Sequence, residues 1–111
     1  MDPLSDYRQI VRRAIAEYAP FKPSYGDVEV EMIFDDSRGH YELSWIGWDG
    51  WRRVHSCLIH IDILEDKVWI QHDGTENGIA EELVAAGIPR DHIVLAFHHP
   101  SKRKLTEYAV A

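Results

Sequence analysis

Hydrophobic residues near the start of the chain recur at intervals of three and four, which is the spacing of one apolar face on an α-helix. The pattern covers residues 3–18 and consists of Leu4, Tyr7, Val11, Ala14, Ile15 and Tyr18. Asp2 is placed to cap the first turn, and Pro3 is compatible with a first helical position. Pro20 and Pro23 prevent the helix from continuing. The pattern therefore predicts an amphipathic helix followed by a loop.

From Val28 the period changes to two, and the alternation of apolar and polar residues predicts four consecutive strands. We expect these strands over residues 28–34, 41–47, 52–63 and 67–72. Asp49-Gly50 is a strong hairpin signal between the second strand and the third. The alternation slips in the middle of the third strand, which favours a β-bulge near His55 or Ser56. Short connections between the strands indicate an antiparallel meander.

The last third of the chain returns to a helical pattern. Thr75 is predicted to be an N-cap, with Glu76 in the first turn and Gly87 closing the helix. The apolar run 93–97 is predicted to return to the sheet as a short buried strand. The fold class that follows is α+β: an N-terminal helix, a four-stranded antiparallel meander, a second helix and a short C-terminal strand. We expect the helices to pack on one face of the sheet.

The length of 111 residues corresponds to one domain, so we assign residues 1–111 to a single core. The formal net charge is −7, and an acidic chain repels the phosphate backbone unless its basic residues are clustered. Two small basic clusters are present, Arg8 with Arg12 and Arg13, and Lys102 with Arg103 and Lys104. Each is compatible with a solvated face or with a binding patch, and the net charge disfavours direct binding to nucleic acid.

The single cysteine, Cys57, lies in an apolar stretch and excludes an internal disulfide, which fits a reducing cytosol. The N-terminal residues MDPLSDYRQ lack the basic end and apolar run of a signal peptide. No window approaches the ~20 apolar residues of a membrane-spanning helix. We therefore expect a cytoplasmic protein without membrane contact.

Seven histidines prompt a search for metal or catalytic chemistry. The sequence contains no GxSxG elbow, no CxxC or HExxH pair and no Gly-rich phosphate loop, and no base for Cys57 is identifiable. His60 and Asp62 point to one face of the third strand, but two ligands without a third are weak evidence for a metal. We therefore expect no catalytic residue, no cofactor and no metal ligand, in a chain that is not an enzyme.

Polar residues at the junction between the fourth strand and the second helix have two interpretations. The candidate contact residues are His72, Asp73 and Glu76, with His98 and His99 returning nearby. Such a junction can present a carboxylate and free helix N–H groups to a ligand or a partner. In the structural interpretation, which is favoured, Asp73-Gly74 makes the turn, Thr75 caps the helix and His72 ends the strand.

The tryptophans of the hairpin point to an interaction surface. Trp48 and Trp51 flank the Asp49-Gly50 turn, where complete burial is difficult, and Arg52 and Arg53 follow directly. Exposed aromatic residues beside arginines are typical of interface anchors. In the alternative interpretation, the indoles pack across strands or cover the open face of the sheet. These four residues are therefore a candidate partner surface.

Longer motifs are more specific than these patterns. The chain opens with DYRQIVRRAIAEYA (6–19) and carries GWDGWRR (47–53) before the strand segment LIHIDI (58–63). It continues with WIQHDGTE (69–76), and GIP (87–89) and IVLAF (93–97) follow. Over nearly the whole chain, these motifs resemble those of the XisI family. In one departure, His98-His99-Pro100 stands where the family typically has HAP, so a partner contact at that loop would differ in specificity.

The resemblance implies a small α+β accessory factor of programmed DNA-element excision in cyanobacteria. In the family, the factor and a companion protein, XisH, control excision of the fdxN element during heterocyst differentiation, while a separate recombinase cuts and joins the strands. We therefore expect a non-enzymatic control factor that binds an XisH-like partner through the sheet face and the hairpin 48–53. The acidic balance fits a basic protein partner better than DNA.

Two other functions stay open at the sequence level. One is a small-molecule or anion-binding domain centred on His72, Asp73 and Glu76, and the other is an enzyme that uses the same residues. Homo-oligomerisation is compatible with any of these functions, because a small sheet leaves an edge to protect.

Overall fold

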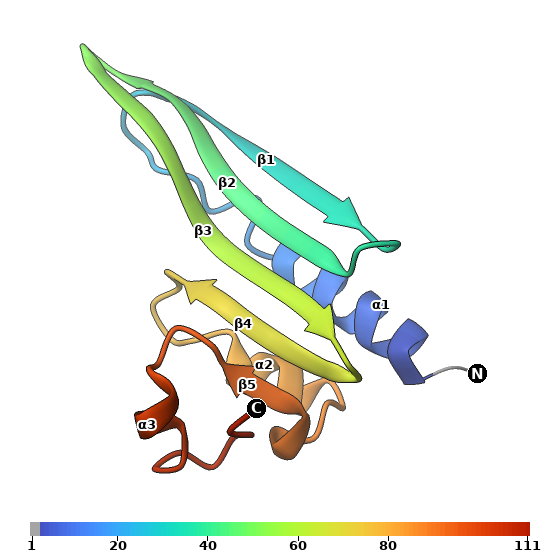
Figure 1. Cartoon of the computed structure of the whole chain (residues 1–111). Helices are drawn as coiled ribbons and strands as arrows, with labels where there is room; N and C mark the ends of the chain where they lie inside the picture. The colour runs from blue at the N-terminus through green and yellow to red at the C-terminus, as the bar shows by residue number, and fades with distance from the viewer. Residues whose placement is uncertain (1–2) are drawn as a thin grey trace.

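A five-stranded sheet forms the frame of the protein in a computed structural model that describes residues 3–111, with side chains described from Asp6 onward (Figure 1). The helices are α1 (Pro3–Ala16), α2 (Ala80–Ala85) and α3 (Pro100–Arg103), and a 3-10 turn, η1, spans Arg90–His92. The strands are β1 (Asp27–Asp35), β2 (His40–Asp49), β3 (Arg52–Leu64), β4 (Lys67–Asp73) and β5 (Ile93–Leu95). This order confirms the predicted fold class, to which α3 and η1 are additions. The predicted cap at Asp2 lies outside the described residues.

The strands lie across the sheet in chain order, β1-β2-β3-β4-β5. β1 to β4 pair antiparallel, as predicted, whereas β5 pairs in parallel with β4 after the crossover through α2. Opposite Leu43 and Ser44, β3 contributes Ile59 and Cys57, so Leu58 is the extra residue of a bulge. The bulge was expected near His55 or Ser56, and that position was wrong, because the extra residue lies closer to the C-terminal end of β3. The alternation does not locate the bulge, because Cys57, Leu58 and Ile59 are all apolar and any of them could be the extra residue.

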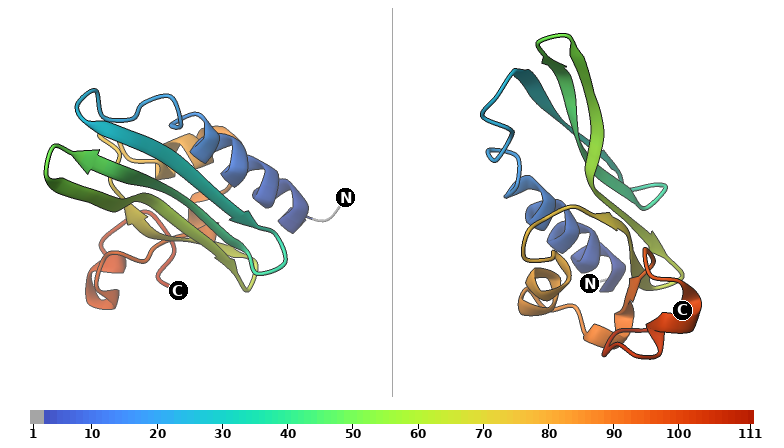
Figure 2. Two further views of the ribbon diagram at one scale, coloured as in Figure 1. Left: turned by 90° about the horizontal axis from the view of Figure 1, so that it is seen from above. Right: turned by 90° about the vertical axis from the view of Figure 1, so that its left-hand side faces the viewer.

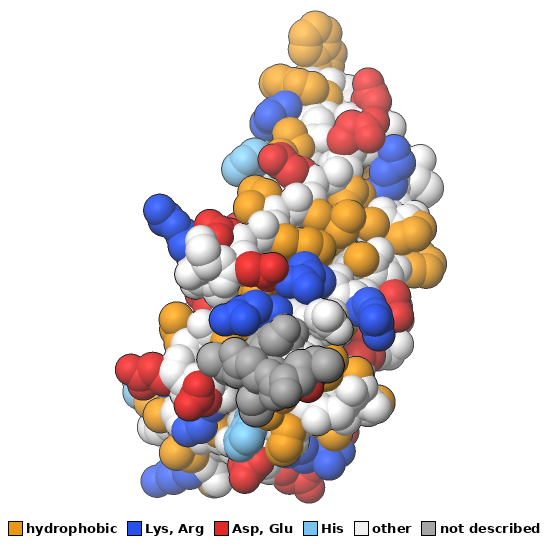
Figure 3. All heavy atoms as spheres, turned by 90° about the vertical axis from the view of Figure 1, so that its right-hand side faces the viewer, with side chains coloured by type: hydrophobic (Ala, Val, Ile, Leu, Met, Phe, Trp, Pro, Cys, Tyr) orange, Lys and Arg blue, Asp and Glu red, His pale blue; other side chains and the backbone are white. Residues whose placement is uncertain are grey.

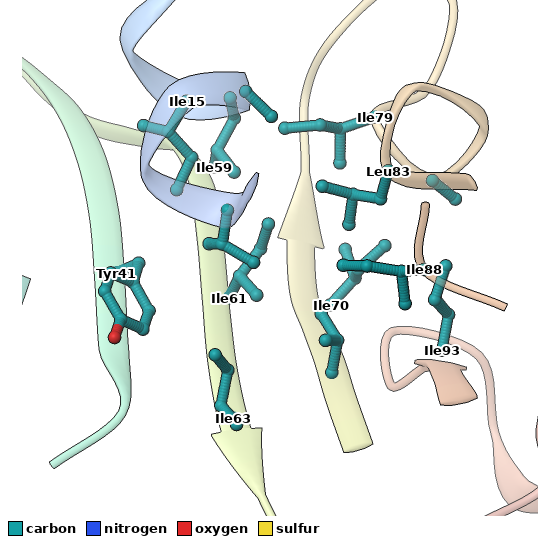
Figure 4. Close-up of a cluster of buried hydrophobic side chains, with 14 of the residues drawn as sticks. Ile15, Tyr41, Ile59, Ile61, Ile63, Ile70, Ile79, Leu83, Ile88 and Ile93 are labelled. Carbon is teal, nitrogen blue, oxygen red and sulfur yellow. The ribbon is translucent and has the colours of Figure 1, made fainter. Parts of the chain in front are cut away.

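α1 and α2 lie on the same face of the sheet and enclose the core between them (Figure 4). The fully buried side chains of this layer include Val11 and Ile15 of α1, Tyr41, Leu43, Ile59, Ile61, Ile70 and Ile93 of the sheet, and Ile79, Leu83 and Ile88 in and around α2. Full burial of one such aliphatic side chain contributes about 1.5–3 kcal/mol, so this layer is the main driving force for folding. From Tyr7 onward, the apolar stripe predicted for the first helix is the one that packs here.

The second helix is shorter than predicted. It begins at Ala80, so Thr75 is not its N-cap and Glu76 is not in its first turn. The chain instead forms a loop around Asp73, whose Oδ1 accepts hydrogen bonds from Thr75 N at 3.0 Å and Thr75 Oγ1 at 2.5 Å. The other oxygen, Oδ2, accepts from Ile79 N at 2.8 Å. One carboxylate from the end of β4 thus satisfies three of the donors that precede the helix.

β2 and β3 extend beyond the helices as a long hairpin that projects from the body of the molecule (Figures 1 and 2). The radius of gyration is 14.7 Å and the principal extents are 43 × 34 × 23 Å. A compact chain of this length has a radius of gyration of about 13 Å, so the projection elongates the molecule. Gly47 lets β1 lie close against this hairpin, because a Cβ there would be 2.0 Å from the carbonyl oxygen of Asp27.

The segment after β5 crosses to the other face of the sheet. Trp69 points away from the core because it alternates along β4 with the buried Val68 and Ile70. The guanidinium of Arg103, in α3, lies 5.6 Å from the centroid of the Trp69 indole. The two predicted helices, α1 and α2, therefore share one face, as expected. α3 was not predicted, because four residues are too few to show a helical period in the sequence. Within residues 3–111, no helix is long and apolar enough to cross a membrane.

Candidate functional site

The open face of the sheet, opposite α1 and α2, carries histidine and carboxylate side chains that meet across two strands. In β2, His40 and Glu42 flank a buried tyrosine, and in β3, His60 and Asp62 flank a buried isoleucine. Because successive side chains of a strand point to opposite faces, all four point away from the core. The register places His40 opposite Asp62 and Glu42 opposite His60. We call these four residues the open-face cluster.

Asp62 is the centre of the open-face cluster. Its Oδ1 lies 3.1 Å from His40 Nδ1 and 3.1 Å from His60 Nε2. The other ring nitrogen of His40, Nε2, lies 2.9 Å from Glu42 Oε2. The two imidazole rings are inclined by 50° with their centroids 4.5 Å apart. The side chains of the cluster are 19% to 34% exposed, so solvent and small solutes reach them.

Each carboxylate of the open-face cluster also has a neutral polar neighbour. Ser44 Oγ donates a hydrogen bond to Glu42 Oε1 at 3.1 Å. Gln71 Nε2 donates to Asp62 Oδ2 at 3.2 Å. Gln71 is the additional residue of β4 at a second register shift, opposite the step from His60 to Ile61. The orientation of both carboxylates is thus fixed from two sides.

The contacts in this region change proton affinities. The hydrogen bond with Glu42, together with the charge of Asp62, raises the pKa of His40 against the opposing effect of burial. The same hydrogen bond lowers the pKa of Glu42. Burial, with the charge of Glu42, raises the pKa of the Cys57 thiol. A thiol held in its protonated form is a poor nucleophile, so this cysteine is not activated for covalent chemistry.

The sequence revealed only half of the open-face cluster. His60 and Asp62 were recognised as a pair on one face of a strand, without a third ligand. The third and fourth groups, His40 and Glu42, have the same spacing in the preceding strand, and that repeated pattern of a histidine and a carboxylate two residues apart was the available signal. Only the register of β2 against β3 shows that the two pairs face each other.

The hairpin tip, Trp48–Arg53, lies at the end of the projection, away from the helices (Figure 1). Trp51 is 100% exposed and Trp48 is 51% exposed. The guanidinium of Arg53 lies 5.2 Å from the centroid of the Trp48 ring, and Arg52 pairs with Asp49 at 3.3 Å. The structure thus brings together the four candidate partner residues of this hairpin and leaves the Trp51 indole fully in solvent.

The loop between α1 and β1 adds aromatic surface beside the hairpin tip. Tyr25, in this loop, is 49% exposed. The guanidinium of Arg52 lies 5.8 Å from the centroid of the Tyr25 ring. In the space-filling view, hydrophobic side chains occupy the extreme end of the projection, with basic and acidic side chains directly below them (Figure 3). The sequence did not predict this contribution. It indicates a loop over residues 20–26, but it does not show which part of the surface that loop lies against.

The candidate residues of the strand-to-helix junction do not converge on one point. His72 lies opposite His60 and therefore shares the open face, whereas Asp73 lies opposite Ile59 and points to the core side. The Asp73 carboxylate accepts hydrogen bonds from the chain itself, as described above. Glu76 is exposed in the loop before α2. These positions fit the structural interpretation of the junction better than a common anion site.

His98 and His99 belong to the turn that leads into α3. The ring of His98 lies 4.6 Å, centroid to centroid, from that of Phe97. His99 is the N-cap of α3, where its Nδ1 accepts a hydrogen bond from Ser101 N at 3.2 Å. Among the described residues, neither histidine forms a hydrogen bond or an ion pair with His72. His99 therefore has a structural role in starting the short helix.

A depression of about 400 Å³ lies between the root of the hairpin and the loop before α2. Its lining residues are Tyr18, Phe21, Trp45, Leu58, Gly74, Thr75, Glu76 and Asn77. The Nε1 atom of Trp45 is buried and has no hydrogen-bond partner among the described residues. Of the junction residues proposed from the sequence, Glu76 is the one that lines this depression.

Comparisons with known proteins extend over almost the whole chain. The family described as "XisI protein" matches residues 1–110. A crystal structure of a XisI-like protein from Anabaena variabilis ATCC 29413 is 42% identical with a TM-score of 0.91, over 97% of this chain and 99% of that one. A crystal structure of fdxN element excision controlling factor XisI from the same organism is 38% identical with a TM-score of 0.87, over 99% of this chain and 100% of that one. No curated protein matches the chain.

Proposed function

This chain belongs to the XisI family, and from that premise we propose that it is a non-enzymatic control factor of DNA-element excision that acts by binding an XisH-like protein. A role in excision control is supported by the similar structure of an fdxN element excision controlling factor. The XisH-like partner and the setting of heterocyst differentiation come from the family resemblance. The place of contact is proposed from the structure of this chain.

The observation that carries the proposal is the complete exposure of Trp51 at the end of a projecting hairpin. Full burial of a large apolar side chain contributes about 1.5–3 kcal/mol. An indole that is exposed in the free protein can gain this free energy only when a partner covers it. Tryptophan and arginine dominate binding free energy at protein interfaces. The hairpin tip, with Arg52 and Arg53 beside two indoles, has the composition of an interface centre.

Charge and nucleophilicity support the rest of the proposal. The net charge of −7 favours a basic protein partner over the DNA backbone. The raised pKa of the Cys57 thiol, caused first by burial, disfavours covalent catalysis by that residue. A role without catalysis is therefore consistent with the chemistry of the described side chains.

The test is binding between the tag-captured chain and the XisH-like protein of the same cell. We expect stoichiometric recovery of that protein from a DNase-treated lysate, identified by mass spectrometry. With both proteins purified, the double variant Trp51→Ala/Arg52→Ala is expected to bind at least about 10-fold more weakly, because hot-spot residues contribute 2 kcal/mol or more. Full-strength binding by this variant would reject the hairpin tip as the contact.

Leu105→Ala is the matched control for the double variant. Leu105 is 80% exposed and lies in the C-terminal segment, far along the chain from the hairpin. Its removal is expected to leave the affinity unchanged. Equal losses in Leu105→Ala and in the double variant would indicate nonspecific hydrophobic association rather than a defined contact.

A second candidate function is the binding of a small molecule in the depression beside Trp45. The observation that favours it is the buried Trp45 Nε1, a donor without a partner among the described residues. Such a donor would be satisfied by an acceptor on a ligand. A screen of small molecules by NMR would follow the indole N–H signal of Trp45. A saturable shift of that signal would support ligand binding, and an unmoved signal throughout the screen would count against it.

A further inference from the structure

The open-face cluster has the donor set of a transition-metal site. Two imidazoles and one carboxylate, those of His40, His60 and Asp62, each offer a ligand atom, and these atoms all lie within 4.8 Å of one another. We propose that this cluster binds one Zn²⁺ ion through His40 Nδ1, His60 Nε2 and Asp62 Oδ1. The inference rests on the geometry of the sheet and does not depend on the proposed function.

Two of the three atom pairs have nearly the spacing of ligands around one ion. Zn²⁺ binds imidazole nitrogen at about 2.0–2.1 Å and carboxylate oxygen at about 2.0–2.2 Å, and two tetrahedral ligands at these lengths are about 3.3 Å apart. Both nitrogens lie 3.1 Å from Asp62 Oδ1. The two nitrogens lie within 4.8 Å of each other, so rotations of these partly exposed side chains would place one ion against all three atoms.

The surroundings of these atoms have the arrangement that orients metal ligands. A metal-bound histidine usually donates its other ring N–H to a carboxylate, which fixes the tautomer. His40 has this partner, because its Nε2 lies 2.9 Å from Glu42 Oε2, and Ser44 Oγ in turn holds Glu42. Gln71 Nε2 holds the remaining oxygen of Asp62. Two of the three ligands are thus supported by a second layer of hydrogen bonds.

The cluster also leaves room for a further ligand. A depression of about 500 Å³ opens beside it, with His40 and Asp62 among its lining residues. Zinc sites with three protein ligands complete their coordination with water or an external group. Solvent in this depression can supply that ligand.

The charges and the ligand types identify the class of cation. In the described part of the chain, the ion-pair partners of Glu42 and Asp62 are histidines, with no lysine or arginine among them. When the imidazoles are neutral, as metal ligands must be, the two carboxylates attract a dication. Imidazole nitrogen favours zinc and its transition-metal neighbours, whereas Mg²⁺ and Ca²⁺ favour all-oxygen sites.

Calorimetric titration of the tag-free, metal-stripped full chain with ZnCl₂ tests the proposal. We expect saturable binding of one ion per chain, with loss of that binding in His60→Gln and in Asp62→Asn. Glu42→Gln is expected to weaken it about 10–100-fold, the usual effect of removing a carboxylate that orients a metal-bound histidine. Thermal unfolding should show a higher Tm with Zn²⁺ for the wild type, and no such increase for His60→Gln or Asp62→Asn.

His55→Gln is the matched control, because His55 is an exposed histidine on the same strand and the same face, opposite Ile46. It is expected to bind Zn²⁺ like the wild type. Circular dichroism of every variant verifies that the fold is retained, which the partial exposure of the cluster favours. Absence of saturable one-to-one binding by the wild type would overturn the proposal. So would unchanged affinity in a folded His60→Gln protein.

Discussion

Asp36 shows how a single residue of this protein joins elements that are distant in the sequence. It lies in the turn between β1 and β2, and its Oδ1 accepts a hydrogen bond from Tyr41 Oη at 2.7 Å. The same oxygen pairs with the guanidinium of Arg12 in α1. The ring of Tyr41 is fully buried, so its hydroxyl needs this acceptor at the edge of the core. The turn is thereby fixed to the helix and to the sheet.

Acid is expected to weaken this connection. The hydrogen bond from Tyr41, with the charge of Arg12, lowers the pKa of Asp36 below its ordinary value of 3.8. A carboxyl with a lowered folded-state pKa contributes stability above its unfolded-state pKa, and that stability is lost as the pH falls through the folded-state pKa. We therefore expect the unfolding free energy to fall more steeply below about pH 4 in the wild type than in Asp36→Asn. Urea unfolding at stepped pH measures both.

Glu17→Gln serves as the control for this titration. Glu17 is exposed at the end of α1, and its carboxylate has no hydrogen bond or ion pair among the described residues. This variant should therefore keep the pH dependence of the wild type. If the curve of Asp36→Asn runs parallel to that of the wild type down to the acid limit, the stabilising role of the Asp36 contacts is refuted.

At the scale of elements, strands were easier to predict than the second helix. The four strands of the meander begin and end within two residues of their predicted bounds. Alternation of apolar and polar residues is a direct consequence of one buried face, so each strand carries its own signal. α2 has six residues and takes its start from Asp73, seven positions before Ala80. A cap from the end of a strand has no local sequence signature, whereas Thr75 has the residue type of an N-cap, so the local pattern favours Thr75.

Asp73→Ala is expected to destabilise the protein by about 2 kcal/mol, because it leaves backbone and hydroxyl donors of the 74–79 loop without their charged acceptor. Glu76→Ala, three residues later, is expected to change stability by less than about 0.5 kcal/mol, as exposed side chains without specific contacts usually do. Urea unfolding of both variants checks the difference. Similar losses in the two variants, or a larger loss in Glu76→Ala, would favour a helix that starts at Thr75.

At the scale of the whole molecule, the two ends of the sheet differ in how far other elements cover them. The hairpin end projects past α1 and α2, whereas the β4–β5 end is covered on its open face by the segment that contains α3 (Figures 1 and 2). Arg103 fastens this segment through hydrogen bonds from its guanidinium to the carbonyl oxygens of Ala96 and His98, at 3.3 Å and 3.1 Å. It also lies over Trp69. One arginine thus links the chain terminus to the sheet.

Arg103→Ala is expected to loosen the C-terminal segment while the core stays folded. The amide of Ala109, which donates to the carbonyl oxygen of Ile93 at 2.8 Å, should exchange its hydrogen at least about 10-fold faster, and Trp69 fluorescence should report greater solvent exposure. Lys102→Ala, an exposed neighbour in α3, should leave both signals unchanged. Native-state hydrogen exchange that is equal in the two variants would show that Arg103 does not hold the segment.

The sequence by itself determined what depends on local periodicity. Apolar stripes located α1 and the four strands of the meander, the turn residues located the hairpin, and specific motifs indicated the XisI family, whose match over residues 1–110 confirms it. These features were predictable because a helix or strand with one buried face has apolar residues that recur every 3.6 or every 2 positions along the sequence.

Tertiary structure alone decided how those elements meet. The register of β2 against β3 brings His40 and Glu42 to His60 and Asp62, and Leu58 in its bulge sets that register. Asp73 starts α2 from a distance, and the segment around α3 folds over Trp69. Such pairings join residues up to tens of positions apart through contacts that only the packed core fixes. A local pattern can place a side chain on a face, but it cannot choose the partner across from it.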